Sequence, residues 1–206
     1  QKFVEFPKKE QPITIEHLLT HTSGIPNFTD GPHYTPEAYA KDIELKDVIA
    51  LFADLPLEFA PGTDWNYSNS GYLLLTAIIE KASGQSWTDY ANEHLFKPAG
   101  MARSSAAITG GALPEEATGY ARGEKGWEPA KPISLTWPRA AGCIRSTVGD
   151  LWKWNSSVFA GKLILPASLA KAHKGVVLAD GTVHPYGYGW SMMNVQGSPS
   201  IEHGGG

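Results

Sequence analysis

A strongly apolar segment of this sequence extends from Gly71 to Ala82. Ser68 or Asn69 precedes the run as a possible cap, and Gly84 follows it. Small polar residues are favoured at helix starts, and glycine is favoured just beyond helix ends. The pattern therefore predicts one long helix with both ends marked in the sequence.

Shorter helices are predicted from their start signals. Thr35 followed by Pro36 places a capping residue before a proline at the first helical position. Ser86 and Thr147 are each followed by an aspartate three residues later, which resembles a capping box with Asp in place of Glu. The expected helices begin after Thr14, Thr35, Ser86, Thr147 and at Pro166, with one more near Val48 to Phe52.

Strand signals lie at the end of the sequence. Large and small residues alternate with period two from Tyr186 to Met192, which predicts a strand with its aromatic residues on one face. Ser198-Pro199-Ser200 is expected to turn the chain into a second strand at 201–203. Because two strands alone form a marginal sheet, we expect the rest of the sheet to lie outside this chain.

Composition is that of an ordinary soluble globular protein, with 42% hydrophobic and 18% charged residues and a formal net charge of −4 over 206 residues. The acidic balance argues against nucleic acid as a partner, because phosphate binding needs a basic face. No apolar stretch reaches the ~18 residues of a membrane span. Cys143 is the single cysteine, expected to be a buried small hydrophobe, so no internal disulfide can form.

The candidate chemistry centres on Tyr67 and Asn69, which flank the start of the long helix. A phenol has a pKa of about 10 and must be lowered to act as a base near neutrality. The helix N-terminus or a nearby ammonium would lower it. Asn69 offers a donor and an acceptor suited to holding an amide. By itself the pattern is weak, because an asparagine before a helix is more often a cap.

Five ordered motifs give this pair a context, and together they cover nearly the whole chain. By them the sequence resembles the serine β-lactamase-like family, which includes class C β-lactamases, D-Ala-D-Ala carboxypeptidases and related esterases. The motifs are the segment 13–25 with His21-Thr22-Ser23-Gly24, Pro61-Gly62 with Tyr67-Ser68-Asn69, Ala140-Ala141-Gly142 with Asp150, Tyr186 to Trp190, and His203-Gly204-Gly205.

The resemblance implies a fold and a set of roles. The fold is α+β, with residues 1–183 forming a mostly helical lobe and 184–206 the truncated start of an antiparallel sheet. Tyr67 would shuttle a proton, and Asn69 would hold the substrate. The catalytic set is completed by His203, at a position where many relatives carry Lys. The expected substrate-binding residues are Gly204, Gly205, Gly206, Trp65 and Trp137, and Gly206 would supply one oxyanion-hole amide.

The nucleophile implied by the resemblance is a Ser-x-x-Lys well before Ile13, and none stands there. The one Ser-x-x-Lys, at Ser168 to Lys171, follows the tyrosine motif, so we interpret it as a surface helix. The chain is therefore expected to be an internal fragment, inactive alone. The compartment stays open between periplasmic or secreted and cytoplasmic, because no signal region is recognisable.

Three classes of function follow from these observations. The favoured one is a serine acyl hydrolase that acts on a small ester, amide or peptide and needs no cofactor. The second is a non-catalytic peptide-binding or structural module, which self-associates or pairs with a complementary chain. The third is a zinc protein, because His17 and His21 are spaced four apart on a predicted short helix; no third ligand is evident, so no metal is expected.

Overall fold

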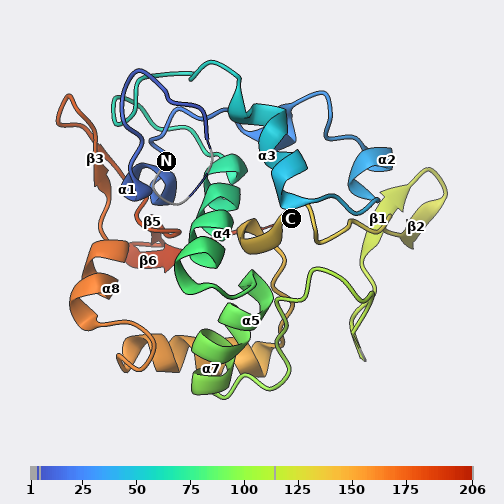
Figure 1. Ribbon diagram of the computed structural model, residues 1–206. Coiled ribbons are helices and arrows are strands. Elements are labelled where there is room, and N and C mark those ends of the chain that lie inside the picture. Colours follow the sequence, from blue (N-terminus) through green and yellow to red (C-terminus); the bar gives the residue numbers. More distant parts are fainter. Residues whose placement is uncertain (1–3, 5, 114, 206) are drawn as a thin grey trace.

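The long helix predicted from the apolar run forms the centre of the molecule. The computed structural model describes residues 4, 6–113 and 115–205. In it, α4 (Asn69–Ser83) runs through the middle of the fold, with α3 (Leu45–Ala53) to one side and α5 (Trp87–Ala91) and α7 (Val148–Phe159) below it in the view of Figure 1. Gly84 ends α4 in the left-handed conformation at φ 73°, as the sequence indicates.

The start signals are confirmed for the shorter helices. Thr14, Thr35, Ser86 and Thr147 each accept a hydrogen bond from a backbone amide at the third helical position. Besides α4, the helical elements are α1 (Ile15–Leu19), η1 (Phe28–Asp30), α2 (Pro36–Tyr39), α3 (Leu45–Ala53), α5 (Trp87–Ala91), the π-helical turn η2 (Asn92–Phe96), α6 (Lys97–Ala99), η3 (Arg139–Ala141), α7 (Val148–Phe159) and α8 (Pro166–Ala172).

Strands in the described residues form three antiparallel pairs. The hairpin of β1 and β2 projects at the right edge of Figure 1, far from β5 and β6 in that view. The pairs are β1 (Tyr120–Gly123) with β2 (Gly126–Pro129), β3 (Val176–Val177) with β4 (Val183–His184), and β5 (Ser191–Val195) with β6 (Ser198–Glu202).

The expected strand from Tyr186 to Met192 is wrong in most of its length. Gly187 donates to the carbonyl of Trp190, and Gly189 has φ 75°, so this segment is a tight turn. A Cβ on Gly187 would lie 2.0 Å from the Ala172 carbonyl oxygen, so the small residue is there to let the end of α8 approach. A small residue in this segment therefore reflects close packing against the backbone of α8 and not the alternation of a strand. The strand begins only at Ser191.

The expected turn at Ser198-Pro199-Ser200 is also wrong, because these residues lie inside β6. The chain turns instead at Gln196 and Gly197, with φ 51° and 86°, between the paired residues Val195 and Ser198. Two consecutive positive φ angles are typical of the hairpin turns that match strand twist. Pro199 is tolerated because both strands of a two-stranded sheet are edges.

Two apolar clusters hold the helices together. The larger packs α4 against α1, α3 and η1, and the smaller gathers around α5, η2 and α6. Leu73 and Val48 are completely buried in the first. Cys143 is completely buried in the second, where its sulfur accepts a hydrogen bond from the Trp87 indole at 3.2 Å. The fold class is α+β, as predicted.

Candidate active site

The start of α4 presents Tyr67 and Asn69 side by side. The Tyr67 hydroxyl donates to Asn69 Oδ1 across 3.4 Å. Ser68 is the N-cap but makes no side-chain capping bond. The amide of Asn69 donates instead to Oδ1 of Asn27 at 3.0 Å, so a residue from a distant loop satisfies this helix end.

The same loop holds the carboxamide of Asn69. Its Nδ2 lies 3.4 Å from Asn27 Oδ1 and 3.5 Å from Thr29 Oγ1, while Asn27 Nδ2 donates to Thr29 at 2.7 Å. The hydrogen bonds of the Asn69 side chain are long, whereas the bond between Asn27 and Thr29 that supports it is short. A firmly built loop therefore supports an amide whose own hydrogen bonds are weak enough to be exchanged for a ligand.

His203, the residue that follows β6, lies near this end of α4. Its ring centroid lies 6.1 Å from that of Tyr67, and its Nε2 lies 2.9 Å from the hydroxyl oxygen of Tyr186. The structure therefore brings Tyr67, Asn69 and His203 into one neighbourhood. His21 and Tyr186 complete the group, and we call these five residues the Tyr67 cluster.

His21 is the buried centre of the cluster, with 1% of its surface exposed. Its ring lies 4.3 Å from Tyr67 and 4.8 Å from Tyr186, and Nδ1 accepts the amide of Ser68 at 3.1 Å. Burial, with the nearby His203, lowers the pKa of His21 to about 4. The sequence placed His21 only in a family motif and in the zinc hypothesis, and nothing local marks this packing.

The phenols of the cluster titrate above their usual range. Burial raises the pKa of Tyr67, and burial is also the main reason for the raised pKa of Tyr186. The helix N-terminus was expected to lower the pKa of Tyr67, but among the described residues the effect of burial is larger and the pKa is raised. In this chain Tyr67 is a protonated phenol at neutral pH, and a cation would have to approach it to make it a base.

The remaining predicted residues divide between this neighbourhood and the core. The Trp65 ring lies 6.0 Å from His21 and 5.7 Å from Tyr186 and stacks on His184 at 4.0 Å, so it borders the cluster. Trp137 is 4% exposed and stacks on Phe28 in the larger apolar cluster, so the structure does not bring it to Tyr67. Gly204 and Gly205 are exposed beside His203, and Gly206 lies outside the described residues.

The zinc hypothesis is not supported by the backbone. Helix α1 ends at Leu19, and His21 has φ 59°, so His17 and His21 do not share a helix face. Both nitrogens of His21 are already used by Ser68 and Tyr186. Within the described part of the chain, no group of three or more His, Cys, Asp or Glu residues is arranged to hold a metal ion.

Ser168 lies exposed on α8, and its amide begins that helix by donating to the Leu165 carbonyl.

No helix among residues 4, 6–113 and 115–205 has both the length and the apolar character needed to cross a bilayer.

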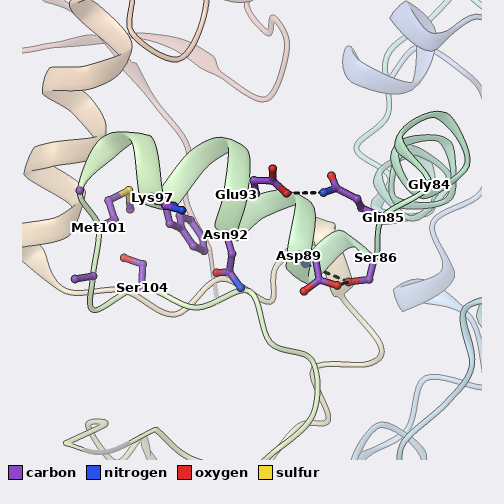
Figure 2. Close-up of a pocket in the computed structure, with 12 residues that line it drawn as sticks. Gly84, Gln85, Ser86, Asp89, Asn92, Glu93, Lys97, Met101 and Ser104 are labelled. Carbon is purple, nitrogen blue, oxygen red and sulfur yellow. Dashed lines mark hydrogen bonds between the residues drawn. The ribbon is translucent and has the colours of Figure 1, made fainter.

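A hollow of about 980 Å³ lies along α5, η2 and α6, with none of the Tyr67 cluster in its lining. Figure 2 shows two pairs among its polar side chains: Gln85 donates to Glu93 at 2.6 Å, and Ser86 donates to Asp89 at 2.7 Å. A binding site usually presents polar groups free to meet a ligand. The Tyr67 cluster therefore remains the better candidate.

Comparison with known proteins places this chain in a known family. Residues 1–206 match the family model described as Beta-lactamase, and the chain belongs to the Beta-lactamase family. It is 31% identical to penicillin-binding protein 4* of Bacillus subtilis over 95% of this chain and 47% of the relative. It is 27% identical to a D-aminopeptidase of Gluconobacter oxydans, over 97% and 38%.

Solved structures of the same class superimpose closely. A D-stereospecific amidohydrolase from Streptomyces sp. has a TM-score of 0.83 at 25% identity, covering 94% of this chain and 61% of that one. The octameric penicillin-binding protein homologue from Pyrococcus abyssi has a TM-score of 0.73 at 26% identity, covering 97% and 48%. The chain spans about half the length of the curated relatives it matches.

Proposed function

We propose that this chain is the mostly helical lobe, 1–183 with the first sheet strands at 184–206, of a serine acyl hydrolase that works through an acyl-enzyme. The observation that carries the proposal is the meeting of Tyr67, Asn69 and His203 at the start of α4. A phenol that can pass a proton and an amide that can hold a carbonyl are what acyl transfer requires at one place.

In the proposed reaction a serine hydroxyl attacks the substrate carbonyl and gives its proton to Tyr67, which passes it to the leaving group. Water then releases the acyl group by the same route. Because burial raises the pKa of Tyr67, the reaction needs a neighbouring ammonium to oppose it. A Ser-x-x-Lys would supply both groups, and we place it in the part of the whole protein beyond residues 1–206.

The proposed substrates are D-amino-acid amides or peptides and small esters, with β-lactams less favoured. His203 stands where many relatives carry Lys, and a neutral imidazole gives less attraction for a substrate carboxylate than a fixed ammonium. The D-aminopeptidase and the D-stereospecific amidohydrolase among the similar proteins favour the same class.

We also expect the protein to self-associate through α7. Val148, Leu151, Trp152 and Phe159 are 52–87% exposed, and their spacing places them along one side of the helix. An apolar stripe of this kind marks an association surface, and the similar protein from Pyrococcus abyssi is octameric. Light scattering tests this: Trp152→Glu should lower the mass of the assembly, and an unchanged mass contradicts the assignment to α7.

Covalent labelling tests the hydrolase proposal. The whole protein that carries this chain is treated with a fluorophosphonate or penicillin probe and examined by intact mass and peptide mapping. Chromogenic ester, D-amino-acid anilide and cephalosporin substrates are assayed in parallel. We expect one adduct, on a serine outside α8, that survives in Ser168→Ala.

Two outcomes would contradict the proposal. An adduct on Ser168 would show that the exposed serine of α8 is the nucleophile after all. The absence of both adduct and turnover, together with saturable binding of a D-alanyl peptide, would favour the non-catalytic peptide-binding module.

A further inference from the structure

A continuous chain of hydrogen bonds links the start of α4 to the end of β6. The Ser68 amide lies 3.1 Å from His21 Nδ1, and His21 Nε2 lies 3.1 Å from the Tyr186 hydroxyl oxygen. The same hydroxyl lies 2.9 Å from His203 Nε2. We propose that Tyr186 and His21 are positioning residues, which hold His203 in one orientation and in the tautomer protonated at Nδ1.

The direction of the chain is fixed at its buried end. A backbone amide can only donate, so Nδ1 of His21 accepts from Ser68 and carries no proton. His21 is 1% exposed, and burial keeps its pKa near 4, so the ring is neutral at neutral pH. Its single proton therefore lies on Nε2, where it is donated to Tyr186.

Tyr186 passes the direction on to His203. Its oxygen accepts from His21, and its own hydrogen remains free to be donated. Burial raises the pKa of Tyr186, so that hydrogen stays in place. The Tyr186 hydroxyl oxygen lies 2.9 Å from His203 Nε2, so this hydroxyl donates to Nε2 when Nε2 carries no proton. A carbonyl oxygen can only accept, and Nδ1 of His203 lies 2.6 Å from the Gly204 carbonyl oxygen, so a neutral His203 carries its proton on Nδ1 and accepts at Nε2.

The opposite direction is excluded by the same geometry. A proton on Nδ1 of His21 would point at the Ser68 amide hydrogen, and two donors would face each other in a buried place. That arrangement would lower the stability of the folded state, because a buried donor would be left without a hydrogen-bond partner. At His21, each donor has an acceptor only in the direction from Ser68 to Tyr186.

The titratable side chains packed around His21 agree with this direction. Tyr67 and Tyr72 flank the ring at 4.3 and 5.1 Å, and the pKa of each is raised, with burial as the first cause. Both are therefore neutral phenols at neutral pH. Among the described residues in ring contact with His21, no charged partner favours a second proton on it.

The consequence for the site is that His203 is not a freely rotating side chain. It follows the last strand residue and is exposed, so its orientation would otherwise cost rotamer entropy at every encounter with substrate. The bond from Tyr186 aims the ring towards Tyr67. Tyr186 and His21 act only through His203. This catalytic meaning rests on the proposed function, whereas the tautomer does not.

The tautomer can be measured directly. Two-bond proton–nitrogen correlation NMR of the histidine-labelled protein at pH 7.5 distinguishes the protonated nitrogen of each ring. We expect His203 to be protonated at Nδ1 in the wild type and to change mainly to Nε2 in Tyr186→Phe. Tyr188→Phe is the matched control, because Tyr188 lies in the same turn but donates to Glu16; its His203 spectrum should not change.

Two results would overturn the proposal. One is a wild-type His203 protonated at Nε2, which needs no variant and is decisive even if Tyr186→Phe does not fold. The other is a folded Tyr186→Phe in which the His203 tautomer is unchanged.

Activity of the whole protein separates this inference from the proposed function. We expect Tyr186→Phe to lower kcat roughly tenfold to a hundredfold with little change in KM, because a misplaced group slows the chemical step. A protein without hydrolase activity but with the Nδ1 tautomer would contradict the proposed function and support the hydrogen-bond chain. Full activity with the Nε2 tautomer would do the reverse.

Discussion

The buried His21 makes the stability of the protein depend on acid pH. Its ordinary pKa of 6.5, which applies to the unfolded chain, falls to about 4 in the folded protein. Between these values the unfolded chain binds a proton that the folded protein does not. Stability is therefore fully present above pH 6.5 and is lost as the pH falls towards 4.

The size of the effect follows from the two pKa values. At about 1.36 kcal/mol for each pH unit, their difference corresponds to roughly 3 kcal/mol, which is a large share of a typical domain stability of about 5–15 kcal/mol. His17 and His184 also have pKa values lowered by burial, so they add to the loss with the same sign. The contribution of His21 must therefore be taken as a difference between variants.

Urea unfolding followed by tryptophan fluorescence between pH 7.5 and pH 4.5 measures this difference. His21→Gln keeps a donor towards Tyr186 but removes the buried ring that accepts the Ser68 amide, so the variant should be less stable at pH 7.5. Because glutamine does not titrate, the variant should lose much less stability on acidification. His94→Gln is the control, since His94 is exposed. The reasoning is refuted if wild type and His21→Gln lose the same stability between pH 6.5 and pH 4.5.

Three further predictions concern the structure that supports the site. Leu73 is completely buried, so Leu73→Ala should lower the free energy of unfolding in urea by about 2–5 kcal/mol; a loss below 1 kcal/mol would contradict its place in the core. Gly24→Ala should destabilise the protein more than Gly84→Ala. Both have φ above 70°, but only at Gly24 would a Cβ meet a backbone oxygen, that of Phe59 at 2.1 Å; equal losses would refute the contact. Burial raises the pKa of Cys143, so a disulfide reagent should label it slowly when native and promptly in urea; prompt native labelling would show that it is accessible.

The helix starts were predictable because their signals are local. Thr14, Thr35, Ser86 and Thr147 each cap a helix through an amide three residues away, so a short stretch of sequence contains the whole interaction. The helix around residues 71–82 was likewise marked by its apolar run and by Gly84.

The turn at 186–190 was not predictable, because the reason for its small residues lies in another element. Gly187 is small because the end of α8 packs against it. The same holds for the centre of the candidate site. His21 and Tyr186 are far apart in sequence, and their hydrogen bond forms only when the segment after α1 packs against the turn before β5. The sequence named Tyr67, Asn69 and His203 through a family resemblance, but it could not reveal the two side chains that connect them.

The central claim is that Tyr67 takes part in acyl transfer at the start of α4. The most direct measurement is kcat of the whole protein on a D-amino-acid anilide for Tyr67→Phe, beside Tyr90→Phe on α5 as a matched loss of one hydroxyl. We predict that kcat falls by about 10²–10⁴-fold in Tyr67→Phe and stays near the wild-type value in Tyr90→Phe. A folded Tyr67→Phe enzyme with wild-type kcat would contradict the account.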